Sequence, residues 1–502
     1  MTDVSAQAMK RPILLSYPAT FWVANVMELF ERAAYYGLNA VLGRYLTDKV
    51  GGGLGFTADR AGFLQGIIYA AIYVIPILGG ALADRYGYRR MLLFAFSLLS
   101  AGYYMSGAVS TYEGIFATLL LMAVGGGLFK PIISGTIART TTQENSGLGF
   151  GLYYWMINLG ALIAPAIVIY LRAMSWRYVF TASALYCALM LLPVVFVYRD
   201  PPLPENKKSV REVLGAAATV LSDSRFMLMI LIYSCFWILY FQTFGTVLWY
   251  LRDFVDAGPA NDFMASLGLT VKFDAEFVTM INAGTIVLLQ VLVSFIATRF
   301  RPLPVMLTGM LIGTGGFLVL ALTRSVWGFI AGMAVFSIGE MTTHPKYYSY
   351  IGLVAPEDKK AVYMGYAFLY GVIGSLIGSN LGGEMYQTLL TPVIGLRAGP
   401  GAARSFWLVF AALGVVAFLG FFLYDRFFSK DTAETRRRAR SVLVVLYALT
   451  VIVGGLFFAG AVRTFFGEEP SWKTLIQATI MLGLGVGGLV AILRRQGSGA
   501  EA

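Results

Sequence analysis

Three ionisable side chains, Glu28, Glu31 and Arg32, lie close together in the first long apolar segment of the chain. On an α-helix they are three and four residues apart, so they project from the same face. An arginine at the centre of a bilayer costs about 2.5–3.5 kcal/mol on insertion scales, so this face must line a water-filled space or a bundle interior. A buried structural ion pair is the alternative, but charges in such a segment favour proton exchange or the binding of a charged ligand.

A lone lysine, Lys130, precedes Pro131 in the fourth apolar segment. Its ammonium group needs a carboxylate nearby, and the nearest candidates in the first half of the chain are Glu28 and Glu31. Together with Arg32 these groups form a neutral cluster of four charges. One added proton makes the cluster net positive, which would change the salt bridge that forms and the binding of an anionic group.

Other polar side chains interrupt the apolar segments. Tyr35 and Tyr36 extend the stripe of the first segment. Asn158 offers both a donor and an acceptor, which suits either a hydrogen bond between helices or a contact to a ligand. Glu340 is the one acid that we place deep in an apolar segment of the second half, so we expect it to bind a positive group or a proton. His344 lies four residues later and could share that proton, or it could be a satisfied histidine beside a kink.

The composition defines the class of protein. The chain has 502 residues, of which 58% are hydrophobic and 13% charged. Its apolar runs repeatedly exceed the roughly 20 residues that cross a bilayer, which predicts an all-α polytopic membrane protein and excludes a β-barrel. The charged stripe interrupts the first run and no cleavage site follows, so we expect the first helix to be retained. Both cysteines lie in apolar segments, which indicates neither a disulfide framework nor a metal site.

Fourteen apolar segments are long enough to span a membrane. With the N-terminus inside, Lys and Arg are more frequent in the inner segments than in the outer loops, so we expect both termini in the cytoplasm. This asymmetry accounts for the net charge of +11 without a nucleic-acid partner. The segments lie at residues 18–46, 60–83, 91–109, 113–138, 148–171, 177–198, 226–251, 275–298, 303–323, 327–352, 361–389, 404–427, 442–463 and 473–493.

The segments divide into two groups of six and a final pair. The amphipathic end of the region between the groups predicts an interfacial helix. The final pair contains no intramembrane charge, so we expect it to be peripheral to the mechanism. We therefore expect an N-terminal six-helix bundle at 1–198, a cytoplasmic connector at 199–225, a C-terminal six-helix bundle at 226–428, and a basic linker with two additional transmembrane helices at 429–502.

A short polar loop between the second and third segments carries a dense motif. Its glycines permit a tight turn, and its carboxylate can cap a helix or pair with arginines at the membrane edge. The loop resembles the GxxxDRxGxR signature of the major facilitator superfamily, which implies a conformational latch. The motif residues are Gly80, Asp84, Arg85, Gly87, Arg89 and Arg90.

Three further motifs resemble those of the proton-dependent oligopeptide transporter family, within the same superfamily. They are ExxERxxYYG at Glu28–Gly37, the Lys130-Pro131 pair, and YYxxINxG at Tyr153–Gly160. The resemblance extends over about residues 15–428 and is strongest in the first half. It implies the major facilitator fold and a proton-driven importer of small peptides that works by alternating access.

The resemblance also implies roles for single residues. Protons would be the coupling ion, with no other cofactor, and would act through Glu28, Glu31, Arg32, Lys130 and Glu340. In a central pocket, Glu340 would receive the peptide ammonium, and basic groups of the first half would hold the carboxylate. The substrate-binding residues would be Arg32, Tyr35, Tyr36, Tyr69, Lys130, Tyr154, Asn158, Trp237, Gln242, Asn282 and Glu340.

The second half departs from the family pattern. Phe241 stands where the family usually has an acid, and Asn39 stands where it has the partner arginine. Because both charges are lost together, neither is stranded, and we expect the outer gate to close through packing and neutral contacts rather than an interdomain salt bridge. Ala283 and Ala367 replace a proline and a tryptophan of the family, which should reshape the pocket wall.

Two other functions compete with peptide import. A proton-coupled carrier of a non-peptide anion or metabolite, such as nitrate or an amino acid, would use the same charged groups. A membrane-embedded enzyme or a sensor would need a nucleophile with its base, a metal site, a phosphate loop or a large soluble domain, and the sequence contains no such pattern. We expect a monomer in the inner membrane of a prokaryote, with the lipid bilayer and short peptides as its partners.

Overall fold

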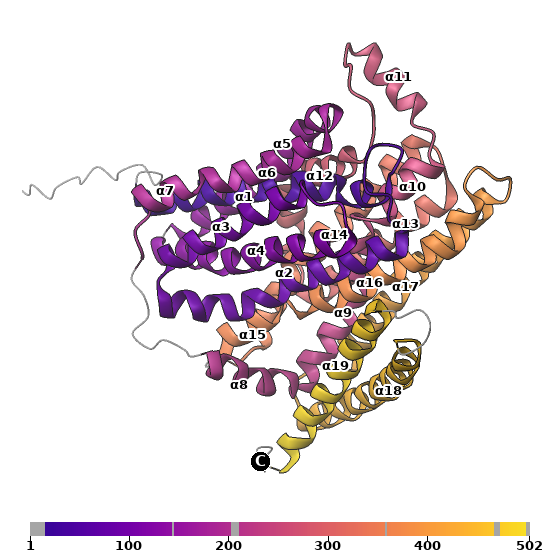
Figure 1. Cartoon of the computed structure of the whole chain (residues 1–502). Helices are drawn as coiled ribbons and strands as arrows, with labels where there is room; N and C mark the ends of the chain where they lie inside the picture. The colour runs from indigo at the N-terminus through magenta and orange to yellow at the C-terminus, as the bar shows by residue number, and fades with distance from the viewer. Residues whose placement is uncertain (1–15, 143–144, 202–209, 357–358, 466–471, 498–502) are drawn as a thin grey trace, which may run out of the picture.

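The computed structural model describes residues 16–142, 145–201, 210–356, 359–465 and 472–497. Within these residues the chain is helical and contains no β-strand, which confirms the all-α class. Most of the long helices run side by side across the molecule, as Figure 1 shows. Helix α1 (Ala19–Thr47) has 29 residues and is therefore roughly 43 Å long, more than the bilayer core of about 30 Å.

The first half of the chain forms six long helices and a short seventh. Helix α1 packs against α5 and α6, while α4 packs against both α2 and α3. Gly87 alone separates α2 from α3, and its φ of 90° is a conformation that glycine adopts without strain. After α1, the helices are α2 (Ala58–Tyr86), α3 (Tyr88–Ser106), α4 (Tyr112–Thr140), α5 (Ser146–Met174), α6 (Trp176–Leu189) and α7 (Leu191–Phe196).

In the second half, two segments that we expected to be continuous are broken. One breaks between Gln242 and Thr246, and the other between Tyr366 and Leu369. Breaks at membrane depth are tolerated where the backbone packs on protein or lines a cavity. The helices are α9 (Ser224–Gln242), α10 (Thr246–Phe254), α11 (Gly258–Ser266), α12 (Glu276–Ala297), α13 (Pro302–Leu322), α14 (Val326–Val354), α15 (Lys360–Tyr366), α16 (Leu369–Met385) and α17 (Gly399–Phe428).

Twelve helices in the described part of the chain are long and apolar enough to cross a membrane. The two expected spans that miss this criterion are α1 and α3. Every window of 18 residues in α1 contains at least three charges, because Glu31 and Arg32 are always joined by Glu28 or Arg44. In α3, Arg89, Arg90 and the tyrosines lower the mean hydropathy of the helix. The charges that make α1 interesting chemically are those that weaken its hydropathy.

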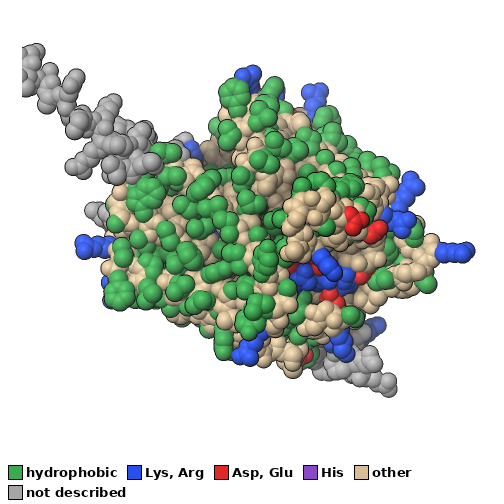
Figure 2. Space-filling model, turned by 90° about the horizontal axis from the view of Figure 1, so that it is seen from above, with side chains coloured by type: hydrophobic (Ala, Val, Ile, Leu, Met, Phe, Trp, Pro, Cys, Tyr) green, Lys and Arg blue, Asp and Glu red, His purple; other side chains and the backbone are tan. Residues whose placement is uncertain are grey.

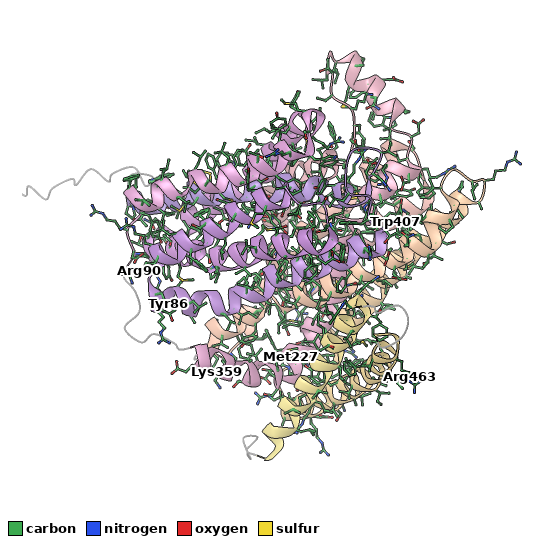
Figure 3. The ribbon with its side chains drawn as sticks, viewed as in Figure 1. Tyr86, Arg90, Met227, Lys359, Trp407 and Arg463 are labelled. Atoms are coloured by element: carbon green, nitrogen blue, oxygen red, sulfur yellow. The ribbon has the colours of Figure 1, made fainter. Side chains whose placement is uncertain are left out.

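The surface of the helical body suits a lipid environment. Hydrophobic side chains cover much of the face in Figure 2, and charged side chains lie at its rim and in one group to the right of centre. Leu288 and Val291 of α12 are each 80% exposed, as expected for side chains that face lipid rather than water. Figure 3 places Arg90 and Lys359 toward one end of the molecule. We name this end the inner side, from the expected topology, and the end with the α1–α2 turn the outer side.

Three helices lie outside the two groups of six. Helix α8 (Val210–Leu221) belongs to the connector, whose residues 202–209 lie outside the described part. Helices α18 (Ala433–Phe465) and α19 (Trp472–Gly497) pack on each other, and α18 also contacts α9 (Figure 1). The fold thus confirms the two additional C-terminal helices. The division of the chain at residues 198, 225 and 428 remains our proposal.

Candidate functional site

Glu28, Glu31 and Arg32 lie together on the buried face of α1, with exposed fractions of 2%, 1% and 5%. Arg32 Nη2 is 2.5 Å from Glu31 Oε2, and Arg32 Nε is 3.5 Å from Glu28 Oε1. Gly126 of α4 faces this pair, since a Cβ there would be 3.7 Å from Glu31 Oε1. One guanidinium therefore pairs with two acids, and a proton on either acid would shift it toward the other.

Lys130 has a different neighbour from the one that we expected. Its ammonium nitrogen lies 4.9 Å from the ring centroid of Tyr73 on α2, a cation–π contact. Among the described side chains it forms no ion pair with Glu28 or Glu31, although both act on it electrostatically. Both acids already pair with Arg32, and the Lys130 ammonium lies over the Tyr73 ring instead. Its charge is thus available to an anionic group of a ligand.

Two tyrosines lie beside Arg32, and a third, Tyr69, lies in the packed core. The guanidinium carbon lies 4.8 Å and 5.9 Å from the ring centroids of Tyr35 and Tyr36. Tyr36 is half-buried, whereas Tyr69 is only 1% exposed and donates its hydroxyl to Asn39 Oδ1 at 2.8 Å. The expectation that Tyr69 contacts substrate is therefore corrected, because its hydroxyl and its ring both bind neighbouring protein groups.

Glu340 of α14 has Asn282 of α12 as its partner. Asn282 Nδ2 donates to Glu340 Oε2 at 2.8 Å and to Ser337 Oγ at 3.0 Å. His344 turns away from this carboxylate, since its Nδ1 lies 3.1 Å from the Tyr233 hydroxyl. Of the two interpretations of His344, the contacts therefore favour the satisfied histidine, and an amide contact from Asn282 fixes the Glu340 carboxylate.

Trp237 and Gln242 of α9 have different environments. Trp237 packs against His344 at a centroid distance of 5.1 Å and against Tyr370 at 4.4 Å, within an aromatic wall. Gln242 Nε2 instead donates to the Gly378 carbonyl of α16 at 2.9 Å. Its Oε1 accepts from the Thr246 hydroxyl at 2.9 Å, and the residue is 1% exposed. Gln242 therefore ties the break after α9 to α16, and the expected substrate contact is corrected.

On α5, Tyr154 is 43% exposed, whereas Asn158 is 8% exposed. Asn158 Nδ2 donates to the Tyr154 carbonyl at 2.8 Å within the same helix, which leaves its Oδ1 for another group. Gly160 lets α5 lie against α1, because a Cβ there would be 2.9 Å from the Leu29 carbonyl oxygen. The close packing brings Tyr154 to the level of the charged cluster.

These side chains surround a space between the two halves of the molecule. Tyr36, Lys130, Tyr154, Asn282 and Glu340 are all partly exposed, although they lie in the middle of long helices. Glu340 also acts electrostatically on Tyr36 and Tyr154, which places it opposite α1 and α5. One wall thus presents the Lys130 ammonium, and the other presents the Glu340 carboxylate. Such a space can bind a molecule with an anionic and a cationic end.

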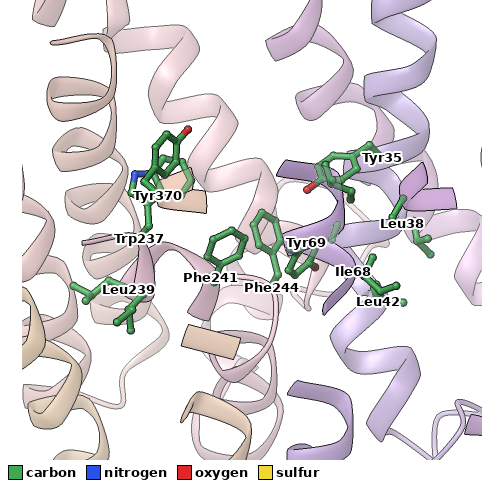
Figure 4. Close-up of a cluster of buried hydrophobic side chains, with 14 of the residues drawn as sticks. Tyr35, Leu38, Leu42, Ile68, Tyr69, Trp237, Leu239, Phe241, Phe244 and Tyr370 are labelled. Atoms are coloured by element: carbon green, nitrogen blue, oxygen red, sulfur yellow. The ribbon is translucent and has the colours of Figure 1, made fainter. Parts of the chain in front are cut away.

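On the outer side of this space, neutral side chains close the gap between the halves. The ring of Tyr69 stacks on Phe241 with centroids 5.4 Å apart and also contacts Phe244 (Figure 4). Gln65 Nε2 donates to the Phe244 carbonyl at 2.7 Å, and Trp249 Nε1 donates to the Gly43 carbonyl at 2.9 Å. Around Phe241 the outer gate closes as the loss of the charge pair predicts.

Farther out, an ionic cluster also joins the halves, so the expectation of a gate without an interdomain salt bridge is wrong. Arg172 of α5 is 2.9 Å from Asp274 and 2.5 Å from Glu276 at the start of α12, and Arg44 of α1 pairs with Asp274 as well. Arg44 also pairs with Asp48 at 3.0 Å. Burial raises the pKa of Asp48, but hydrogen bonds from the Gly51 amide and Arg44 outweigh it and hold the pKa below its ordinary value.

The signature loop makes its polar contacts with the first half and with the start of the connector. Asp84 Oδ1 is 3.3 Å from Arg139 Nη2 of α4 rather than from an arginine of the motif. The Arg89 amide donates to Asp200 Oδ1 at 2.6 Å, and its guanidinium donates to carbonyl groups at the end of α7. The loop thus fastens α2 and α3 to the neighbouring helices at the inner side.

The other motif residues shape the loop. Gly80 faces α4, Gly87 makes the turn, Arg85 lies over an aromatic ring of its own helix, and Arg90 is exposed. A cavity of about 320 Å³ adjoins this region, lined in part by Arg139. It lies at the inner end of the first half, away from the two charged walls.

Comparisons with known proteins agree with this arrangement. The family model described as Major Facilitator Superfamily matches residues 21–379. The Dipeptide and tripeptide permease B of Aliivibrio fischeri is 32% identical over 225 residues, which cover 41% of this chain and 44% of that protein. The Uncharacterized transporter YclF of Bacillus subtilis is 33% identical over 30% of this chain and 32% of its own length. The matched region therefore spans less than half of these relatives.

Solved structures show the same fold over most of the chain. A POT family transporter in complex with 5-aminolevulinic acid has a TM-score of 0.67 at 20% identity, and the match covers 83% of this chain and 99% of that one. A peptide transporter POT in complex with sulfate has a TM-score of 0.67 at 18% identity, over 82% and 94% of the two chains. The chain is therefore a multi-pass membrane protein that belongs to the major facilitator superfamily.

Proposed function

We propose that the protein is a proton-coupled symporter that imports di- and tripeptides across the cytoplasmic membrane of a prokaryote by alternating access. The observation that carries this proposal is the opposition of charge across the central space. Arg32 and Lys130 lie on one wall, and Glu340 lies on the other. A peptide is a zwitterion of matching polarity, so its carboxylate and its ammonium can bind both halves at once.

Proton coupling in this proposal belongs to the pair of acids around Arg32. Glu28 and Glu31 share one guanidinium in a buried site. When one acid takes a proton, Arg32 pairs with the other, and the positive charge left for an anion increases. Protons are then the coupling ion, and the mechanism uses no other cofactor. The peptide carboxylate binds beside Lys130, whose ammonium rests on the Tyr73 ring.

The proposed substrate contacts follow the geometry. Tyr36 and Tyr154 border the space, Asn158 contributes its side-chain amide, and Trp237 belongs to the aromatic wall. Asn282 orients the Glu340 carboxylate toward the peptide ammonium. The protein acts as a monomer, with both termini in the cytoplasm and the lipid bilayer around its apolar surface.

Uptake by reconstituted protein tests this function. Proteoliposomes with an inward proton gradient should accumulate a labelled dipeptide, and a protonophore should abolish the accumulation. Counterflow against unlabelled dipeptides, amino acids and nitrate compares the cargo classes under identical conditions. Exchange with nitrate or with single amino acids, but not with dipeptides, would replace the proposal by the non-peptide carrier.

A further inference from the structure

Helices α18 and α19, which we call the C-terminal hairpin, are tied to the second half at the inner side. Helix α18 packs on α9, where the Ser224 hydroxyl donates to the Arg436 carbonyl of α18 at 3.4 Å, and Arg225 holds the segment just before α18 through an ion pair with Asp431 at 2.8 Å. The two helices also pack tightly on each other, since a Cβ at Gly488 would clash with the Tyr447 ring. The hairpin is therefore expected to move with the second half as one body.

At the outer side, Lys473 of the hairpin contacts both halves. Lys473, in the first turn of α19, lies 2.7 Å from Asp59 Oδ2 of α2 and 3.2 Å from Glu384 Oε2 of α16. One turn later, Gln477 Nε2 donates to Asn380 Oδ1 of α16 at 2.6 Å. The contacts to α16 stay within the second half and the hairpin, whereas the contact to Asp59 crosses to the first half.

Lys473 lies over the seam where the two halves meet. Beside Asp59, the Ala58 amide donates to Gln387 Oε1 at 3.0 Å. Gly62 of α2 lies so close to α16 that a Cβ there would clash with the Ser379 carbonyl oxygen. An outward-open state requires α2 to leave α16 at this level, and the distance from Lys473 to Asp59 must then increase. The ion pair therefore exists only when the outer side is closed.

We propose that the C-terminal hairpin is a brace that holds the outer side closed through the Lys473–Asp59 ion pair. This inference rests on alternating access in the proposed function, but not on the identity of the cargo. The brace biases the protein toward the inward-facing state, because the ion pair stabilises that state alone. Both side chains are 23% exposed, so water screens the pair only in part. Under this proposal the final helix pair takes part in the conformational cycle, contrary to our expectation from the sequence.

The chain offers a matched set of variants. Lys473→Met and Asp59→Asn remove the contact between the halves, whereas Glu384→Gln removes only the contact within the second half. For a partly exposed ion pair, loss should raise the ratio of outward-open to inward-facing protein about two- to fivefold. The Asp59→Lys, Lys473→Asp double variant reverses the pair, and in a Glu384→Gln background, where the new carboxylate meets no second acid, it should restore the parent ratio.

Distances between spin labels measure this ratio directly. Val50 lies in the α1–α2 turn and Leu396 in the turn before α17, and both are exposed at the outer side. With Cys187 and Cys235 replaced, labels at these two positions should show a larger long-distance population in Lys473→Met and Asp59→Asn, in nanodiscs and without substrate. Glu384→Gln should match the parent.

The parent distribution in both Lys473→Met and Asp59→Asn would overturn the brace, and so would an equal shift in Glu384→Gln. Melting temperature and monodispersity exclude misfolding, and Asp59→Asn keeps the shape of the side chain if Lys473→Met does not fold. Since the measurement uses no transport, the brace can be confirmed even if dipeptides are not the cargo.

Discussion

Replacing Glu340 by glutamine tests the polarity of the central space. Glutamine keeps an oxygen that can accept the hydrogen bond from Asn282, now 2.8 Å from the carboxylate, so the amide is not stranded. Only the charge that faces the peptide ammonium is lost. The variant therefore separates recognition of the ammonium from the architecture of the pocket.

The expected magnitude follows from the environment of Glu340. Truncating one partner of a buried, hydrogen-bonded charge pair costs about 2–5 kcal/mol. Glu340 is half-buried and faces a water-accessible space, so the lower part of that range applies. A loss of about 2–3 kcal/mol corresponds to a roughly 30- to 150-fold weaker Kd for a dipeptide with a free amino terminus.

Calorimetric titration of purified protein measures this loss. N-acetylated dipeptide lacks the ammonium, so it should bind the parent weakly and should be almost indifferent to Glu340→Gln. Glu113→Gln, at an exposed carboxylate near the start of α4, is the matched control and should bind like the parent. The same fold loss for free and acetylated dipeptides, or no loss for either, would refute the assignment of Glu340 to the ammonium.

Three other substitutions test the remaining charged groups. Glu31→Gln removes one of the two acids around Arg32, so gradient-driven uptake should be lost while counterflow persists. Equal uptake with and without a protonophore, in the parent and in the variant, would contradict proton coupling through Glu31. Lys130→Met should weaken binding of a free dipeptide about tenfold or more but should barely change binding of its C-terminal amide, because the amide carries no carboxylate; equal losses would remove Lys130 from this role. Arg172→Met leaves Glu276 buried without its arginine, so the outer gate should loosen and a cysteine at Leu42 should react with an external, membrane-impermeant maleimide. Unchanged labelling would show that the outer ionic cluster does not hold the gate.

The sequence predicted the fold and the charged walls because charge in a membrane is costly. Glu28, Arg32, Lys130 and Glu340 are conspicuous among apolar residues, so their functional surroundings could be inferred without a structure. The partner of Lys130 could not, because an aromatic ring such as Tyr73 leaves no pattern that distinguishes a cation–π contact from ordinary packing.

Other features depend on contacts between distant parts of the chain. Arg44 and Asp274 are 230 residues apart, and Lys473 and Asp59 are 414 apart, so no local spacing reports either pair. The sequence around Gln242 is the same whether its side chain binds cargo or the α16 backbone, so the sequence cannot distinguish the two roles. The break after Gln242 is also invisible, because no proline interrupts the apolar run from α9 to α10.

The position of the interdomain charges bears on how protons and cargo are coupled. Glu28 and Glu31 pair with Arg32 inside the first half, and the centre of the outer gate around Phe241 is neutral. A proton taken up by Glu28 or Glu31 therefore cannot break a salt bridge to the second half, because the contacts between the halves around Phe241 carry no charge.

Cargo can supply that missing link. A peptide held between Lys130 on one wall and Glu340 on the other joins the halves through its own two charges. Protonation changes the affinity of the first wall for the carboxylate, and the bound peptide transmits this change to the second wall. A protein of this design should couple protons tightly to zwitterions that span both walls and loosely to ligands with one charge. Measuring protons moved per molecule for a dipeptide and for its C-terminal amide distinguishes this coupling from one that acts without cargo.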